Sequence, residues 1–186
     1  KQRNKLLEQM TDEVSSLVLR DNYQQTLSVT ATEARATQDL DKHQRLIRAM
    51  ERSGDLDRAL EFLPDDEELS ERLQAHKGLS RPELSVILAY AKNITYRELL
   101  DSDLPDDPLL TEDLVRYFPE ALQRKFPENI ANHRLRREII ATAVTNSMIN
   151  RTGPAFVNEM HQRTGMSVSE IARAYTITRE VFQLRP

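Results

Sequence analysis

The chain has 186 residues, of which 39% are hydrophobic and 30% charged, and its net charge is −4. This composition is too rich in aliphatic residues for a disordered protein, and the length suits one globular domain or two small ones. No cysteine is present, which excludes disulfides, thiolate nucleophiles and cysteine-based zinc sites.

Neither a membrane nor a nucleic acid is an expected partner. The most apolar stretch, residues 84–91, is far shorter than the ~20 residues that span a bilayer. The mild acidic balance makes nucleic acid unlikely, because neutralising phosphates requires a basic face. The chain begins with Lys1, and no basic-then-apolar signal region follows it. We therefore expect a cytoplasmic piece of a longer protein.

Apolar residues at helical spacing predict a series of helices in the first part of the chain. The first helix has a stripe of five: Leu6, Met10, Val14, Leu17 and Val18. The second has a stripe of four: Leu40, Leu46, Ile47 and Met50. Gly54 is predicted to end this second helix, and Asp55 to cap the next one. Residues 27–31 alternate briefly between apolar and polar, as a strand would.

Local signals predict where the next helices begin and end. A short stripe of leucines (Leu56, Leu60 and Leu63) stops at Pro64, and the acidic run 65–68 begins a helix that is predicted to close at Gly78. Ser80 and Glu83 form a capping-box pattern with Pro82 in the first turn. The buried stripe of that helix is Leu84, Ile87, Leu88 and Ala91. Residues 95–98 repeat the capping-box pattern and predict a further helix start.

Prolines and glycines divide the rest of the chain. Residues 101–108 contain two prolines and four aspartates and are predicted to form a loop, with a possible subdivision near 101–110. Helices are predicted from Thr111, over 134–150, from Pro154 to Gly165, over 167–174 and over 178–184. The fold class is therefore all-α, an irregular multi-helix bundle of short helices ended by Pro or Gly, in one domain over 1–186.

The sequence contains no glycine-rich motif for dinucleotide binding. The four glycines stand at positions 54, 78, 153 and 165, and the closest two are twelve positions apart. A Rossmann fold clusters glycines so that the backbone can approach the diphosphate, and it alternates strands with helices. The sequence therefore predicts no NAD site within this chain.

Metal ligation is not expected either. The four histidines are His43, His76, His133 and His161, and none has a partner at the spacing of a helical metal site. We expect them on the surface or near helix ends. The aspartates of 101–107 fail the EF-hand pattern, because Pro105 and Asp106 stand where a ligand and a glycine are required. No catalytic, cofactor-binding or metal-binding residue is predicted.

Two charged segments allow a binding role. The most basic stretch comprises Arg124, Lys125, Arg134, Arg136 and Arg137, but interleaved glutamates favour a solvated helix face. Residues 167–182 resemble a helix-turn-helix with Thr176 at the turn, and they would use Arg179 and Arg185 to reach DNA. A DNA-binding or interaction module is therefore the alternative function, although a packing corner between two helices is the simpler interpretation.

Several blocks together resemble the C-terminal part of the large bacterial NAD-specific glutamate dehydrogenases. They are MTDEV (10–14), LVLRDNY (17–23), LSRPEL (79–84), AYAK (89–92), LRREIIAT (135–142), NRTG (150–153) and FV (156–157). The resemblance implies that the longer enzyme oxidises L-glutamate to 2-oxoglutarate and ammonium and passes hydride to NAD. It also implies that the catalytic residues and the nucleotide loop precede this region, so none of them can be assigned to a residue of this chain.

The partners that the resemblance implies are the catalytic domain of the same chain and further copies in a homo-oligomer. The expected role is structural or regulatory, and the chain alone should be inactive.

Overall fold

The computed structural model describes residues 2–184, and within them it contains ten α-helices, two short 3-10 helices and no strand. The predicted all-α class is confirmed. None of the helices in residues 2–184 combines the length with the apolar character that a bilayer crossing requires.

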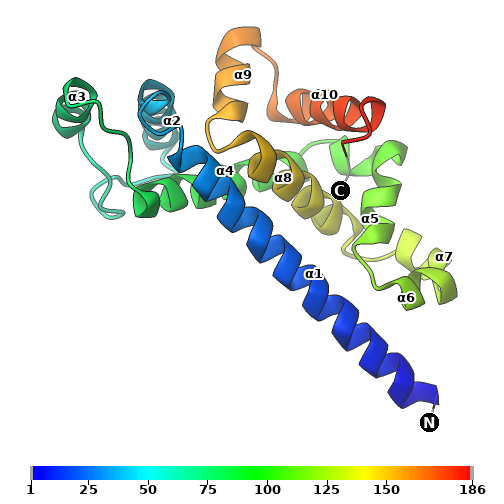
Figure 1. The fold of residues 1–186 in the computed structure, drawn as a ribbon. Coiled ribbons are helices and arrows are strands. Elements are labelled where there is room, and N and C mark those ends of the chain that lie inside the picture. Colours follow the sequence, from blue (N-terminus) through cyan, green and yellow to red (C-terminus); the bar gives the residue numbers. More distant parts are fainter. Residues whose placement is uncertain (1, 185–186) are drawn as a thin grey trace.

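Two long helices form the centre of the molecule. Helix α4 (Arg81–Leu100) packs along α8 (Arg136–Thr152). Helix α1 (Gln2–Glu33) contacts both of them with its second half, while its first half extends toward one corner of the molecule (Figure 1). This arrangement leaves much of the α1 surface without a neighbour.

Shorter elements cover the two ends of the central pair. Helices α2 and α3 lie at the end farthest from the α1 N-terminus, and α5 to α7 lie at the other end (Figure 1). Helix α10 packs against α4, α8 and α9, and α9 also contacts α2. The bounds are α2 (Leu40–Ser53), α3 (Asp66–Gln74), η1 (Leu104–Asp106), η2 (Pro108–Leu110), α5 (Thr111–Arg116), α6 (Glu120–Lys125), α7 (Pro127–Ala131), α9 (Phe156–Thr164) and α10 (Val168–Val181).

Helix α4 takes part in both buried clusters of the chain. Its Leu84 and Ile87 pack with α2 and α3, whereas its Leu88 and Leu99 pack with α5, α8 and α10. Leu104, from the segment in which a subdivision was predicted, is buried in the second cluster. The subdivision near 101–110 remains a prediction.

The local signals for helix ends are largely confirmed. Gly54 ends α2 with a φ of +76°, and Gly165 ends α9 with a φ of +72°, in the left-handed region that glycine tolerates best. The Asp65 carboxylate caps α3 by accepting from the Glu68 amide at 2.8 Å. At the start of α4, the Glu83 carboxylate accepts from the Ser80 amide at 2.6 Å. These signals succeed because each involves residues only a few positions apart.

Residues 27–31, despite their brief alternation, continue α1, in agreement with the all-α class. Three local expectations are wrong. Thr95 is buried inside α4 rather than starting a helix. Leu60 is 71% exposed in a turn, so the leucine stripe before Pro64 is not a helix. Asp55 caps nothing and instead accepts hydrogen bonds from Ser53 and Arg97. Contacts with distant segments override the local pattern at Thr95 and Asp55.

Gly78 has a different role from the predicted one. Helix α3 ends four residues earlier, where His76 adopts the left-handed conformation with a φ of +53°. A Cβ at Gly78 would lie 2.3 Å from the carbonyl carbon of Ala36. Glycine is required there because two backbone segments approach each other closely.

Candidate functional site

Helix α10 is one continuous helix, so the predicted helix-turn-helix is wrong. Its start is fixed by a capping box in which the Ser167 amide donates to Glu170 at 2.8 Å. No glycine or proline interrupts residues 168–181, and Thr176, the expected turn residue, is buried within the helix. An uninterrupted helix lacks the second helix that would enter a DNA groove.

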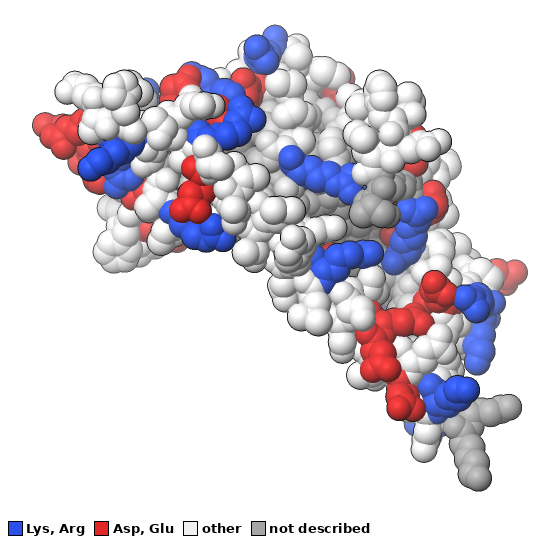
Figure 2. Space-filling model, viewed as in Figure 1, with Lys and Arg blue, Asp and Glu red and all other residues white. Residues whose placement is uncertain are grey.

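Arg179, one of the two predicted DNA-contacting cations, is buried. Its guanidinium donates to the Asp113 carboxylate at 2.8 Å and lies 3.1 Å from Glu180. The side chain is only 5% exposed, so it joins α10 to α5 rather than facing solvent. Arg185 lies outside the described residues. On the face drawn in Figure 2, basic and acidic side chains are interspersed, unlike the continuous basic surface that follows a phosphate backbone.

His43 is buried in α2, contrary to the expected surface position. Its side chain is 2% exposed. Burial lowers the pKa of His43 to about 4, and the neighbouring charge of Lys42 also lowers it, while Asp39 and Asp41 oppose the shift. The imidazole is therefore neutral near pH 7.

The other histidines make separate local contacts. His76 lies at the end of α3, as predicted. The His133 ring lies 5.4 Å from the Phe118 ring, and its Nδ1 accepts from a backbone amide. His161 Nδ1 lies 2.8 Å from the Met166 carbonyl. Residues 2–184 contain no cluster of three or more side chains suited to a metal ion.

The acidic loop and the basic stretch pair with each other. Arg137 contacts Asp106 and donates to the Leu100 and Ser102 carbonyls at 2.8 and 2.7 Å. It thereby caps the end of α4, a role that the sequence pattern did not indicate. From α10, Arg173 lies 3.4 Å from Asp103. These aspartates serve as ion-pair partners.

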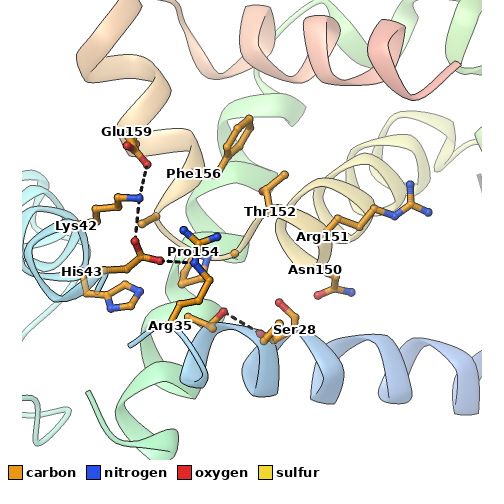
Figure 3. A pocket seen from close by; sticks show the side chains of 15 residues that line it. Ser28, Arg35, Lys42, His43, Asn150, Arg151, Thr152, Pro154, Phe156 and Glu159 are labelled. Carbon is orange, nitrogen blue, oxygen red and sulfur yellow. Dashed lines mark hydrogen bonds and ion pairs between the residues drawn. The ribbon is translucent and has the colours of Figure 1, made fainter. Parts of the chain in front are cut away.

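A pocket of about 280 Å³ lies where the end of α1, the start of α2 and the start of α9 meet the end of α8. Figure 3 shows a chain of ion pairs along one side of it. Arg35 lies 3.2 Å from Asp39, Asp39 lies 2.9 Å from Lys42, and Lys42 lies 3.6 Å from Glu159. We call this the α1/α9 pocket.

Three side chains lining the α1/α9 pocket carry buried polar atoms without a hydrogen-bond partner. They are Ser28 Oγ, His43 Nδ1 and Asn150 Oδ1. Buried polar atoms of this kind are usually satisfied by ordered water or a small polar molecule. Lys42 and Arg35 are already held by carboxylates, and no residue pair in the pocket is placed for nucleophilic or acid–base chemistry.

The four glycines do not form the phosphate-binding turn of a dinucleotide fold. Gly54 and Gly165 end helices, and Gly78 is pressed against Ala36. Gly153 borders the α1/α9 pocket, but a single glycine provides no phosphate-binding turn.

Helix α1 carries several exposed apolar side chains. Of the five residues predicted to share one face of this helix, Leu6, Met10 and Leu17 are partly buried, whereas Val14 and Val18 are 45% and 53% exposed. A second stripe, which was not among the predicted ones, lies on the opposite side. It consists of Leu19, Tyr23 and Leu27, which are 69%, 68% and 51% exposed.

These three residues are spaced four apart, so they lie along one side of the helix. We call them the outer α1 stripe. Exposed apolar side chains in a row are typical of a surface that another protein segment covers. Their helical spacing was present in the sequence and could have been found by testing both sides of the helix.

The comparisons with known proteins place the chain in a family. Residues 76–186 match the family model described as glutamate dehydrogenase, C-terminal. The chain belongs to this glutamate dehydrogenase family. Residues 1–32, nearly all of α1, match a second model, described as the catalytic domain of bacterial NAD-glutamate dehydrogenase.

Curated relatives agree with this assignment. NAD-specific glutamate dehydrogenases of Pseudomonas aeruginosa and Halomonas elongata are 47% and 46% identical over 99% of the chain. That of Mycobacterium tuberculosis is 35% identical over 97% of it. The chain spans about 11% of the length of these relatives. The predicted resemblance is confirmed, and the chain is homologous to the C-terminal part of large NAD-specific glutamate dehydrogenases.

Proposed function

We propose that this chain is a helical structural part of an NAD-dependent glutamate dehydrogenase and does not itself transfer hydride. The longer enzyme would convert L-glutamate and NAD to 2-oxoglutarate, ammonium and NADH. Relatives that carry this name are about nine times longer than the chain, from the 11% of their length that it spans. The dinucleotide site and the reacting groups would lie in the remainder.

The outer α1 stripe is the observation that carries this proposal. Leu19, Tyr23 and Leu27 are exposed here, yet they lie within the span that matches the catalytic-domain model. An apolar stripe is stabilised when it is removed from water, at roughly 25 cal/mol for each Å² of apolar surface. The stripe would therefore dock on the catalytic domain of the same polypeptide, while the inner side of α1 packs on α4 and α8.

This arrangement makes α1 the connection between the two regions. Its second half is tied to the helical body by hydrogen bonds from Lys92 to Gln25 at 3.1 Å and from Arg81 to Thr30 at 3.0 Å. Arg81 also pairs with Glu33 at 2.7 Å. The helical body would thus hold one side of α1 and brace the catalytic domain through the other.

Two experiments test the proposal. The purified chain, given glutamate and NAD, should produce no NADH and should bind NAD no more tightly than millimolar. A clear rise in NADH absorbance would overturn the structural role.

In the complete polypeptide, replacing both Leu19 and Tyr23 by Glu should lower the thermal midpoint and the activity. The control Asn22→Glu places one glutamate on an exposed α1 position outside the stripe, and it should change neither, whereas Tyr23→Glu alone, with the same added charge, should lower both.

A further inference from the structure

The turn between α2 and α3 presents two apolar side chains to solvent. Leu60 is 71% exposed and Phe62 is 90% exposed, whereas Leu56 and Leu63 on either side are buried. The turn lies beside α3, at the end of the molecule far from the α1 N-terminus (Figure 1). We call residues 57–62 the Phe62 turn.

Phe62 occupies a backbone position that glycine normally takes. The Leu63 amide donates to the Arg58 carbonyl at 3.0 Å and the Phe62 amide to the Ala59 carbonyl at 3.4 Å, which is the hydrogen-bond pattern of a Schellman motif. The φ of Phe62 is +54°. A side chain with a Cβ adopts this left-handed conformation at an energetic cost. At the equivalent position after α2, the chain has Gly54.

Buried contacts hold the Phe62 turn in place. Arg58, only 11% exposed, donates to Glu51 at 3.0 Å, to Asp66 at 2.9 Å and to the Pro64 carbonyl at 3.2 Å. The Tyr90 hydroxyl donates to Glu61 at 2.6 Å. The turn is therefore a fixed element, and it presents Leu60 and Phe62 in one preformed arrangement.

Acidic residues flank the two side chains in the sequence. Asp57 accepts from the Ala59 and Leu60 amides, Asp65 caps α3, and Glu67 is exposed in the first turn of α3. Within residues 2–184, none of these three carboxylates forms an ion pair. A complementary surface would be an apolar pocket, able to take a phenylalanine and a leucine, with lysine or arginine at its rim.

We propose that the Phe62 turn is a docking element for a basic-rimmed apolar pocket in the remainder of the same, longer polypeptide. This inference rests on the proposed function, because it requires the longer chain. A covalently attached surface is present at a local concentration up to millimolar. That advantage favours the same polypeptide over a second copy or a separate protein. A rigid turn with preformed side chains also loses little conformational freedom on docking.

Photo-crosslinking in the complete polypeptide tests the proposal. Phe62 is replaced by the photoreactive residue benzoylphenylalanine, and the crosslinked peptides are identified by mass spectrometry. We expect a crosslink within one polypeptide, without doubled mass, to a segment outside residues 1–186 that contains lysine or arginine. The same probe at Phe182, which is 68% exposed, serves as a control for a position with no predicted contact.

A parallel probe at Tyr23 separates this proposal from the proposed function. Crosslinks from position 23 without any from position 62 would overturn the docking of the Phe62 turn and leave the outer α1 stripe supported. Crosslinks from position 62 to a second copy, or to a separate protein, would also overturn it. Phe62→Gly keeps the backbone conformation but removes the side chain. Hydrogen exchange of residues 57–63 should be slower in the complete polypeptide than in the isolated chain, and this added protection should be smaller in Phe62→Gly than in the wild type. Equal added protection in the two proteins would contradict the proposal.

Discussion

The Arg179 guanidinium lies 2.8 Å from the Asp113 carboxylate, and the pair joins two helices whose residues are 66 positions apart in the chain. The two side chains are 5% and 12% exposed, and Arg179 also donates to Ser147 on α8 at 3.3 Å. An arginine that the sequence presented as a DNA contact is therefore a buried link among α5, α8 and α10.

Arg179→Met should lower the free energy of unfolding by about 3 kcal/mol, because it leaves the Asp113 carboxylate buried without its cation. Urea denaturation of the purified chain would measure the loss. The double variant Arg179→Met, Asp113→Leu should recover part of it, since no unpaired charge remains. Arg124→Ala is a suitable control, because Arg124 pairs with Glu120 on the surface at 77% and 66% exposure, and its loss should change stability by at most about 1 kcal/mol. Equal losses for the two single variants would contradict this account.

His43 should make the stability of the chain depend on pH. Its pKa is about 4 in the folded chain and about 6.5 when unfolded, so between these values the unfolded chain binds the extra proton. The contribution of neutral His43 to the free energy of unfolding is complete above about pH 6.5, and it decreases as the pH falls toward 4. The expected loss from about pH 7 to about pH 5 is about 2 kcal/mol. Comparing urea unfolding of the wild type and His43→Gln at both pH values would reveal it. Identical pH dependence in the two proteins would contradict a buried neutral imidazole.

Phe62→Gly should stabilise the isolated chain by about 1 kcal/mol, since glycine adopts the left-handed backbone without the steric cost and the replaced side chain is largely in solvent. The thermal midpoint should rise accordingly. Gly54→Ala provides the reverse control: it places a Cβ at a φ of +76° and should lower the midpoint. A fall in stability for Phe62→Gly would mean that the phenylalanine side chain supports the fold itself.

The parts of the fold that the sequence predicted correctly depend on neighbouring residues. Gly54 and Gly165 end helices, and Asp65 and Ser167 begin them, through contacts within one turn. The same local reasoning failed at Thr95 and Thr176, where a capping or turn residue is buried inside a long helix. Burial by distant segments decides such positions, and helical spacing alone does not reveal it.

The candidate surfaces were less predictable for the same reason. The partner of Arg179 is in another helix. Arg137 contacts the end of α4, which lies more than thirty residues earlier in the sequence. The outer α1 stripe was visible as a spacing of four, but only packing distinguishes the side of α1 that the helical body covers from the side that stays exposed. The left-handed backbone conformation at position 62 could not be predicted, because the residue there is phenylalanine and not glycine.

We propose that the outer α1 stripe docks on the catalytic domain of the same polypeptide. Hydroxyl-radical footprinting tests it directly, by comparing oxidation of Tyr23 in the isolated chain and in the complete polypeptide. We predict strong oxidation of Tyr23 in the isolated chain, where it is 68% exposed, and marked protection in the complete polypeptide. Equal oxidation of Tyr23 in both would contradict the account.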